Sequence, residues 1–540
     1  MKTIEGNIID VVKKEIFKGR IFFDNKIVKI ERDNSIINEQ YILPGLVDAH
    51  VHIESSMLTP LEYSKIATKH GVVAAITDPH EIANVCGMAG INFMTESARE
   101  TPMKIFTGAP SCVPATSFET SGAIISSKEI ETLLSSGQCT HLSEMMNFPG
   151  VIYNDTEVEA KLAIAKKHNK VIDGHAPLLT NEDLKKYIQA GISTDHECTN
   201  LKEAKEKIAL GMKIMLRESS AAKDFGTLMP LIETNPEAVM LCTDDCHPDD
   251  LEKGYINLLV KRALKEEYNI FNILTAATKT TVEHYNLNIG LVQEKDDADF
   301  IVINNLDDFT VLSTFIEGQE VYNGKESLIK NRNKNTINNF YTNEITTEDI
   351  CVKYTSGSIN VIQIVPDSLL THKINYKQEG KTEAIISNTD VDILKIVVLN
   401  RYAKAKPSIG FIQGFELKHG AIAGSIAHDS HNICAIGTSD EEIIKAIKEV
   451  QKTQGGLVVV NGNEIHKLCL PIAGLMSDKD CPSVAKEYKM LSEQAKELGC
   501  TLHAPFMTLA FMSLLVIPEL KLSDKGLFDV TKFNFVKLQN

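Results

Sequence analysis

The chain of 540 residues is long enough for two or three domains with substantial cores. Its net charge of −16 at pH 7 argues against general attraction to nucleic-acid phosphates, and 43% apolar residues is an ordinary composition for a water-soluble protein. No apolar run approaches the length of a membrane span, and the longest, Met507 to Ile517, reads as a buried helix.

Cysteine usage and the first residues favour a cytoplasmic protein. The 11 cysteines are scattered and form no CxxC pair, which is typical of reduced thiols. Residues 1–14 lack the apolar stretch of a secretory signal. We therefore expect a cytoplasmic protein whose partners include neither membranes nor nucleic acids.

Residues 1–43 alternate apolar and polar positions. Within them, GRIFFDNKIVKIE (19–31) predicts a β-hairpin with a tight turn at Asp24 and Asn25. Residues 290–326 return to the same short alternation. We therefore predict one small β domain built from both segments.

Between residues 44 and 289, short apolar runs that end in polar residues alternate with amphipathic stretches such as Thr156 to His168 and Asn181 to Ala190. Eight such units predict an α/β fold with a TIM-like (β/α)8 barrel, whose reactive groups gather at the C-terminal strand ends. The expected strand ends are His52, Asp78, Pro110, Glu144, His175, His196, Arg217 and Asp244.

A third region follows the barrel. The polar, Asn- and Lys-rich segment from Ser327 to Thr347 predicts a linker. Residues 348–540 contain strand patterns in SINVIQIV (358–365) and GGLVVVNG (455–462) and a helix pattern from Ser439 to Thr453. We predict a C-terminal α+β domain.

The strongest chemical signal is LPGLVDAHVHIESS, residues 43–56. Alternate residues of a strand share a face, so Asp48, His50 and His52 are expected to point the same way, and two imidazoles there suit one metal ion. For an HxH pair alone, core histidines explain the pattern equally well. The preceding Pro-Gly and the place on the first barrel strand favour ligands.

Other strand ends supply matching groups: Glu144, His175, His196 and Asp244. Taken singly, such a residue is more often structural than catalytic. Six groups at predicted strand tips are hard to obtain by chance, and four histidines with two carboxylates suit Mn²⁺, Fe²⁺ or Zn²⁺.

Residues 43–290 resemble the amidohydrolase superfamily. Within it, ITDPHEIANVCG (76–87), EMMNFPGV (144–151) and LCTDDCHPDDL (241–251) resemble the bacterial adenine deaminases, and IAHDSHNI (426–433) extends the resemblance to the C-terminal region. The resemblance covers essentially the whole chain. It implies a homodimeric purine-salvage enzyme that uses a metal-activated hydroxide to deaminate adenine to hypoxanthine and ammonia.

The resemblance also implies a binuclear divalent centre, with Mn²⁺ or Fe²⁺ favoured over Zn²⁺. His50, His52 and Asp244 would hold one ion, His175 and His196 the other, and Glu144 would bridge both. Many relatives bridge with a carboxylated lysine on the fourth strand, but GQCTHLSEMMN offers none there. The expected catalytic residues are Asp244 (also the general base), Glu144 and His196.

Several residues keep two interpretations. The resemblance suggests that Asp78, His80 and Glu81 hold an additional cation or line the substrate pocket, whereas Asp78 and Glu81 would also suit a turn and a helix cap. Glu197, Arg217 and Ser219 are candidates for purine binding, and supporting roles fit Arg217 and Ser219 equally. Glu81 and Glu197 are unranked candidates for the ring-nitrogen proton donor.

The C-terminal region also contains His419, His428, Asp429 and His431. The resemblance suggests that the three histidines approach the barrel mouth without serving as ligands of the main centre.

Two other classes of function are weighed. A cyclic-amide hydrolase of the hydantoinase type would keep the fold, but the missing lysine and the TDPHEIANV motif disfavour it. A scaffold that has lost its metals is disfavoured because every expected ligand type is present.

Overall fold

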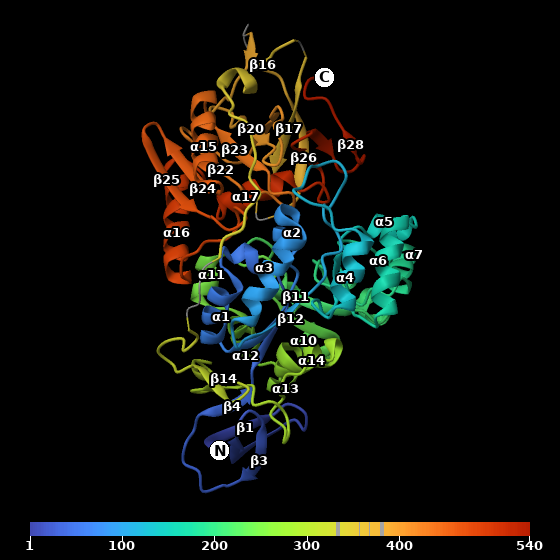
Figure 1. Cartoon of the computed structure of the whole chain (residues 1–540), viewed down its shortest axis with the longest axis vertical. Coiled ribbons are helices and arrows are strands. Elements are labelled where there is room, and N and C mark those ends of the chain that lie inside the picture. Colours follow the sequence, from blue (N-terminus) through green and yellow to red (C-terminus); the bar gives the residue numbers. More distant parts are fainter. Residues whose placement is uncertain (331–334, 356, 367, 379–382) are drawn as a thin grey trace.

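The computed structural model describes residues 1–330, 335–355, 357–366, 368–378 and 383–540. The molecule has three parts along its longest axis (Figure 1). A sheet that contains the N-terminus lies at one end and a barrel of strands and helices lies in the middle. A second, larger sheet with its helices lies at the other end, near the C-terminus.

The N-terminal sheet is built from segments on both sides of the barrel sequence. Its strands are β1 (Lys2–Asp10), β2 (Glu15–Phe23), β3 (Ile27–Arg32), β4 (Tyr41–Pro44), β13 (Phe300–Ile303), β14 (Val311–Ile316) and β15 (Gln319–Tyr322). The predicted hairpin is confirmed, because β2 and β3 pair antiparallel on either side of residues 24–26. Strand β4 joins the two segments, since it pairs parallel with β1 and antiparallel with β13.

The central part contains eight strands: β5 (Leu46–Val51), β6 (Val72–Thr77), β7 (Lys104–Thr107), β8 (Leu142–Met145), β9 (Ile172–Gly174), β10 (Thr194–Asp195), β11 (Lys213–Arg217) and β12 (Val239–Cys242). Those paired within a sheet run parallel. Three contacts close the ring: Ala109 bridges to Leu142, the Ser193 N–H donates to the Ile172 carbonyl, and Val51 bridges to Asp244. The predicted TIM-like barrel is confirmed.

Helices follow the strands and cover the ring. They are α1 (Pro60–Lys69), α2 (His80–Cys86), α3 (Met88–Arg99), α4 (Ser127–Ser135), α5 (Phe148–Ile152), α6 (Thr156–Lys167), α7 (Asn181–Gln189), α8 (Leu201–Ala209), α9 (Phe225–Leu228), α10 (Leu231–Thr234), α11 (Pro248–Lys253), α12 (Ile256–Lys265), α13 (Ile270–Leu274) and α14 (Thr280–Tyr285). Polar residues cap several N-termini: Asp155 accepts the Val158 N–H, and Asn200 accepts the Glu203 N–H.

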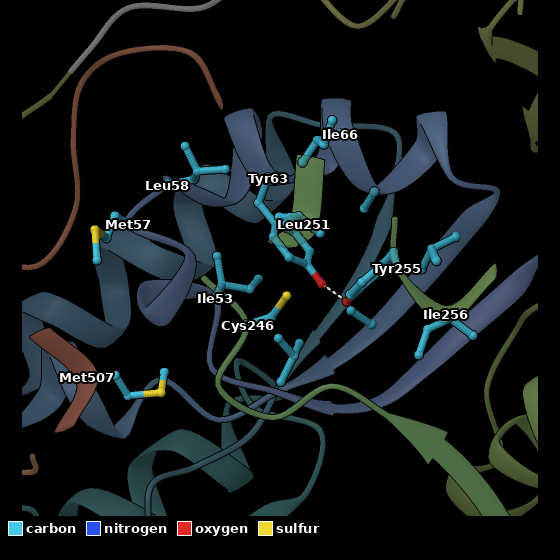
Figure 2. Packing of buried hydrophobic residues seen from close by; sticks show 14 of the residues in the cluster. Ile53, Met57, Leu58, Tyr63, Ile66, Cys246, Leu251, Tyr255, Ile256 and Met507 are labelled. Carbon is cyan, nitrogen blue, oxygen red and sulfur yellow. Dashed lines mark hydrogen bonds between the residues drawn. The ribbon is translucent and has the colours of Figure 1, made fainter. Parts of the chain in front are cut away.

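Apolar side chains fill the layer between β5 and the helices α1, α11 and α12 (Figure 2). Ile53, Cys246 and Ile256 are buried there, and the hydroxyls of Tyr63 and Tyr255 meet inside the layer. Met507, from the C-terminal part, belongs to the same apolar cluster. The barrel and the C-terminal part therefore share one continuous core.

The C-terminal part contains an eight-stranded sheet of order β18-β17-β21-β20-β23-β22-β24-β25. The strands of this part are β16 (Val352–Lys353), β17 (Ile359–Ile364), β18 (Thr371–Tyr376), β19 (Ala384–Ile385), β20 (Leu394–Leu399), β21 (Ser408–Gln413), β22 (Ala421–Gly424), β23 (Ile433–Gly437), β24 (Gly456–Asn461), β25 (Glu464–Cys469), β26 (Leu520–Ser523), β27 (Gly526–Asp529) and β28 (Asn534–Phe535). The helices are α15 (Asp440–Thr453), α16 (Cys481–Glu497) and α17 (Pro505–Ala510). The strands predicted in 358–365 and 455–462 and the helix predicted near 439–453 are confirmed.

The C-terminal part is fastened to the barrel segment that follows β7. Ser430 Oγ donates to Glu119 Oε2 at 2.6 Å, and Asn432 Nδ2 donates to the Thr120 carbonyl at 2.9 Å. Asp524 Oδ1 accepts the Thr120 N–H at 2.9 Å. These contacts hold the connection between β22 and β23 over the C-terminal ends of the barrel strands.

Two local expectations differ from the structure. The helix expected over Met507 to Ile517 ends at Ala510 and is followed by a single 3-10 turn, Phe511–Ser513, whose Phe511 carbonyl accepts a hydrogen bond from Lys521. In the predicted linker, residues 331–334 lie outside the described residues, and Ile345 is fully buried against the C-terminal sheet. Within the described chain, no helix combines the length and the apolar character of a membrane span.

Candidate metal centre

Six of the predicted residues meet at the C-terminal ends of the barrel strands. We call them the mouth cluster: His50, His52, Glu144, His175, His196 and Asp244. None is more than 9% exposed. The Nε2 atoms of His50 and His52 lie 3.2 Å apart, and the His50 ring stacks on His196 with centroids 4.2 Å apart.

Asp244 is fixed beside β5 by its own backbone. Its N–H donates to the His50 carbonyl at 2.9 Å, and its carbonyl accepts the His52 N–H at 3.3 Å. Its φ of 58° lies in the left-handed region, which a non-glycine residue rarely adopts. The side chain then points one oxygen, Oδ1, to within 3.2 Å of His52 Nε2 and 3.8 Å of His50 Nε2.

Glu144 lies at the centre of the mouth cluster, and its two oxygens face different histidines. Oε1 lies 3.3 Å from His52 Nε2. Oε2 lies 2.8 Å from His175 Nδ1 and 3.2 Å from His196 Nε2. The carboxylate therefore links the β5 side of the barrel mouth to the β9 and β10 side.

The electrostatics of the mouth cluster favour charged carboxylates. Burial opposes ionisation of Glu144, but the imidazoles of His175, His196 and His52 outweigh it and hold its pKa well below the usual range. The pKa of Asp244 is likewise held low, against burial, by His52 and Arg217. Burial, helped by His196, lowers the pKa of His50, which keeps that imidazole neutral and leaves a lone pair for a ligand.

Asp78 and His80 are continuous with the mouth cluster. His80 Nδ1 lies 3.2 Å from Asp78 Oδ2 and 3.4 Å from Glu144 Oε1. Glu81 Oε1 lies 3.4 Å from His80 Nε2. The three residues predicted as a second cluster are therefore in contact, and they adjoin the first one.

Arg217 is buried among carboxylates. Its guanidinium makes a paired contact with Glu197 and donates to Asp244 Oδ2 at 2.9 Å and to Asp224 Oδ2 at 3.0 Å. Glu197 Oε1 also lies 3.5 Å from His196 Nε2. Ser219, in contrast, accepts the N–H groups of Ala221 and Ala222 and closes a local turn. Its hydroxyl is thus engaged in supporting the backbone.

The expectation that Asp48 points the same way as His50 and His52 is wrong. Its carboxylate accepts hydrogen bonds from the Thr243 hydroxyl at 2.5 Å and from the Tyr255 hydroxyl, which precedes α12 in the helix–strand layer. The register of β5 against β6 shifts between Asp48 and Val51, and this irregularity breaks the simple alternation of faces.

The C-terminal part brings two histidines to the barrel mouth. His428 Nδ1 lies 2.8 Å from Glu81 Oε1, and His431 Nε2 contacts Glu81 Oε2. Asp429 Oδ1 lies 3.9 Å from His80 Nε2. His419 lies exposed on the surface, so its expected approach to the barrel is wrong.

Sequence reasoning missed Asp245, next to the predicted Asp244. Its Oδ1 accepts the Ser55 hydroxyl, and a carboxylate oxygen of Asp245 lies within 4.8 Å of ligand atoms of His52 and Asp244. The doubled aspartate in LCTDDCHPDDL is the signal that would have identified it.

Several groups at the mouth are close enough to share a cation, with candidate ligand atoms within 4.8 Å of one another. These groups are His50–His196–Asp244, Glu144–His175–His196, His52–Asp78–His80–Glu144, His52–Asp244–Asp245 and Glu81–His428–His431.

Comparisons with known proteins cover the whole chain. The amidohydrolase family model matches residues 41–321, and a model of the adenine deaminase C-terminal domain matches residues 368–534. A protein named adenine deaminase from Methanosarcina mazei is 49% identical over 100% of this chain and 99% of its own length. One of the same name from Sulfurovum sp. is 48% identical over 99% of each chain.

A solved β-aspartyl dipeptidase from Fervidobacterium islandicum AW-1 superposes with a TM-score of 0.47 at 15% identity, covering 61% of this chain and 100% of that chain. The family models and the named relatives match the barrel and the C-terminal part together. The chain therefore belongs to the amidohydrolase family and, within it, to the adenine deaminases.

Proposed function

We propose that this protein hydrolyses adenine to hypoxanthine and ammonia. The observation that carries the proposal is 49% identity, over 100% of the chain, to a protein named adenine deaminase. The mouth cluster supports it, because a buried set of histidines and carboxylates at the C-terminal strand ends is where a barrel of this type places its chemistry.

The amidohydrolase family is metal-dependent, and the mouth cluster fits divalent cations. Glu144 turns one oxygen to each side of the barrel mouth, as a bridging ligand must. Asp78 Oδ1 is buried without a hydrogen-bond partner among the described residues, so it retains free ligand capacity.

We assign His50, His52 and Asp244 to one ion, His175 and His196 to a second, and Glu144 to both. The nitrogen and carboxylate donor set suits Mn²⁺ or Fe²⁺, and also Zn²⁺. A divalent cation bound there would supply Lewis acidity and lower the pKa of a water molecule toward neutrality.

The residues of the chain then direct the proton transfers. A water oxygen attacks C6 of the purine, the C6–N1 π pair moves to N1, and the C6–N6 bond breaks as ammonia leaves. Arg217 holds Asp244 Oδ2, which leaves Oδ1 turned toward the mouth cluster. Asp244 is the general base that takes the water proton and passes it to the leaving amine.

Glu197 and Arg217 form one wall beside His196, and we propose that Glu197 contacts the purine while Arg217 fixes it. Asp78 and His80 either hold an additional cation or line the pocket. We also propose that the protein is a cytoplasmic homodimer with a role in purine salvage. Its domain boundaries are proposed at residues 43–44, 289–290 and 348.

The test is an adenine turnover assay on metal-loaded protein with metal analysis of the same sample. We expect ammonia and hypoxanthine from adenine, and a much lower kcat/KM for adenosine, because a ribose on N9 would collide with a pocket for the free base. Turnover of hydantoin without turnover of adenine would refute the proposal and favour the cyclic-amide hydrolase.

A further inference from the structure

The connection between β22 and β23 brings two histidines of the C-terminal part to the same carboxylate. His428 and His431 each contact one oxygen of Glu81, which lies in the first turn of α2 in the barrel. The two imidazoles differ in what their second nitrogen does, and that difference separates their roles.

His431 has both nitrogens engaged. Its Nδ1 accepts the Ala427 N–H at 3.3 Å, so the proton of the neutral ring lies on Nε2, which faces Glu81. The side chain is 1% exposed. Hydrogen bonds therefore account for the grouping of Glu81 with His431 without a cation, and His431 is a positioning residue that fixes Glu81.

His428 has one nitrogen free. Its Nδ1 is held by Glu81 at 2.8 Å, and its ring stacks on Phe511 with centroids 4.4 Å apart. Its Nε2 has no hydrogen-bond partner among the described residues, and the side chain retains 6% exposure. Glu81 therefore orients the imidazole, Phe511 packs against one of its faces, and Nε2 is left without a hydrogen bond.

His428 also lies close to the reacting centre. A chain of three contacts runs from it to the mouth cluster: His428 Nδ1 to Glu81 Oε1 at 2.8 Å, Glu81 Oε1 to His80 Nε2 at 3.4 Å, and His80 Nδ1 to Glu144 Oε1 at 3.4 Å. Burial disfavours the imidazolium form, but the carboxylates of Glu81, Asp245 and Asp429 outweigh it and raise the pKa of His428 to about 9. Two further ionisable groups near the ring are the imidazoles of His431 and His247.

Glu81 cannot donate the proton itself. Both of its oxygens are occupied by imidazole nitrogens, Oε1 by those of His428 and His80 and Oε2 by that of His431. Glu197 is likewise committed, because its two oxygens are paired with Arg217. Of the donors considered, His428 alone combines an orienting partner with an open nitrogen.

We infer that His428, supplied by the C-terminal part, donates a hydrogen bond and then its proton from Nε2 to N1 of the purine. The inference rests on the proposed deamination. When water adds to C6 and the C6–N1 π pair moves to N1, the new N1–H bond takes the Nε2 proton, and that hydrogen stays in the lactam product. As ammonia leaves with the proton that Asp244 took from the water, the O–H electron pair left on C6 forms the C6=O bond and its proton is released to solvent. The imidazole regains one proton from solvent, so the sum remains adenine plus water to hypoxanthine plus ammonia.

The test compares purine with 1-deazapurine, which differ only at N1, as ligands of metal-loaded full-length protein. We expect the wild type to bind purine about 10- to 100-fold more tightly, the value of a charged hydrogen bond. In His428→Gln this ratio should fall to near 1, and kcat/KM for adenine should fall by about 100-fold or more. The matched control is His419→Gln, an exposed histidine of the same part, which should keep both values.

His428→Asn serves as a second variant, and circular dichroism checks that each protein is folded. An unchanged purine to 1-deazapurine ratio in the folded variants would overturn the inference, as would loss of metal from them, which would make His428 a ligand. The two hypotheses fail separately: a wild type that releases no ammonia from adenine refutes the proposed function, whereas the binding ratio is measured without turnover.

Discussion

Two buried clusters lie on opposite sides of strand β5, and they have opposite effects on the charge of the carboxylate that each contains. The mouth cluster surrounds Glu144 with imidazoles, within 2.8 to 3.3 Å. The second, which we call the tyrosine cluster, consists of Asp48, Tyr63, Thr243 and Tyr255 in the helix–strand layer. Figure 2 shows its two tyrosines. There the Asp48 carboxylate accepts from two hydroxyls and from the N–H groups of His50 and Thr243, and no cationic side chain of the described residues pairs with it.

The difference shows that the partner of a carboxylate, more than its burial, decides its charge. Both carboxylates are 2% exposed or less. In the tyrosine cluster burial prevails over the hydroxyl hydrogen bonds and raises the pKa of Asp48 to about 7. In the mouth cluster the imidazoles prevail and keep Glu144 ionised. A buried ionised carboxylate surrounded by histidines is suited to a cation, whereas a hydroxyl-bound acid is suited to holding β5 against its helices.

The largest expected effect comes from removing the charge at the centre of the mouth cluster. Glu144→Gln keeps the shape but leaves a neutral amide between the two sides of the barrel mouth. We expect loss of metal as well as rate, with a fall in kcat/KM beyond the ~10²–10⁴ that a lost general base alone would cause. Metal analysis and adenine turnover on one sample measure this. Full wild-type metal content in the variant would contradict the bridging role.

A smaller loss is expected from Asp244→Asn, which keeps an oxygen ligand and removes the base. Once metal is fully restored, turnover should remain about 10²–10⁴ below the wild type. The matched control is Asp224→Asn, because Asp224 contacts Arg217 on the other terminal nitrogen, Nη2, without joining the mouth cluster. Near wild-type turnover in metal-replete Asp244→Asn would reduce Asp244 to a ligand and direct the search for the base to His196, Glu197 or Glu81.

The comparison of the two clusters also shows which features could be predicted from the sequence. Strand ends such as His52 and Asp244 were predictable, because an apolar run followed by a polar residue is a local signal. The direction of Asp48 was not, since it depends on a register shift between two strands. The contact of His431 with Glu81 joins residues 350 positions apart, and no local periodicity encodes such a pair.

Disturbing the tyrosine cluster is expected to lower stability and to leave turnover nearly unchanged. Tyr255→Phe removes one donor to Asp48 and leaves the Tyr63 hydroxyl without its partner in that cluster. We expect a loss of about 1–3 kcal/mol in the free energy of unfolding and a change in kcat/KM below about three-fold. Urea unfolding beside adenine turnover measures both, and Tyr153→Phe, at an 81% exposed position, is the control. A large loss of turnover with unchanged stability would tie the tyrosine cluster to the chemistry.

The smallest expected effect extends the comparison to the C-terminal part. Lys521 is fully buried, and its ammonium contacts two neutral acceptors, the carbonyls of Leu369 and Phe511, each at 3.0 Å. Burial lowers the pKa of Lys521 to about 7, the base counterpart of Asp48.

The sign of the resulting pH dependence follows from proton counts. Above pH 7 the folded-state amine has lost its proton while the unfolded-state amine, with an ordinary pKa, still holds one, so the free energy of unfolding rises with pH. Lys521→Met removes this pH-dependent contribution to the free energy of unfolding. Between pH 7 and pH 8 the wild type should therefore gain about 1 kcal/mol over the variant. Urea unfolding of both proteins at the two pH values measures the difference, with Lys448→Met, an exposed lysine on α15, as the control. A difference in the free energy of unfolding between wild type and Lys521→Met that stays constant with pH would mean that Lys521 remains charged in the folded protein. Two carbonyl acceptors would then be enough to keep the buried Lys521 ionised, whereas hydroxyl donors do not keep Asp48 ionised.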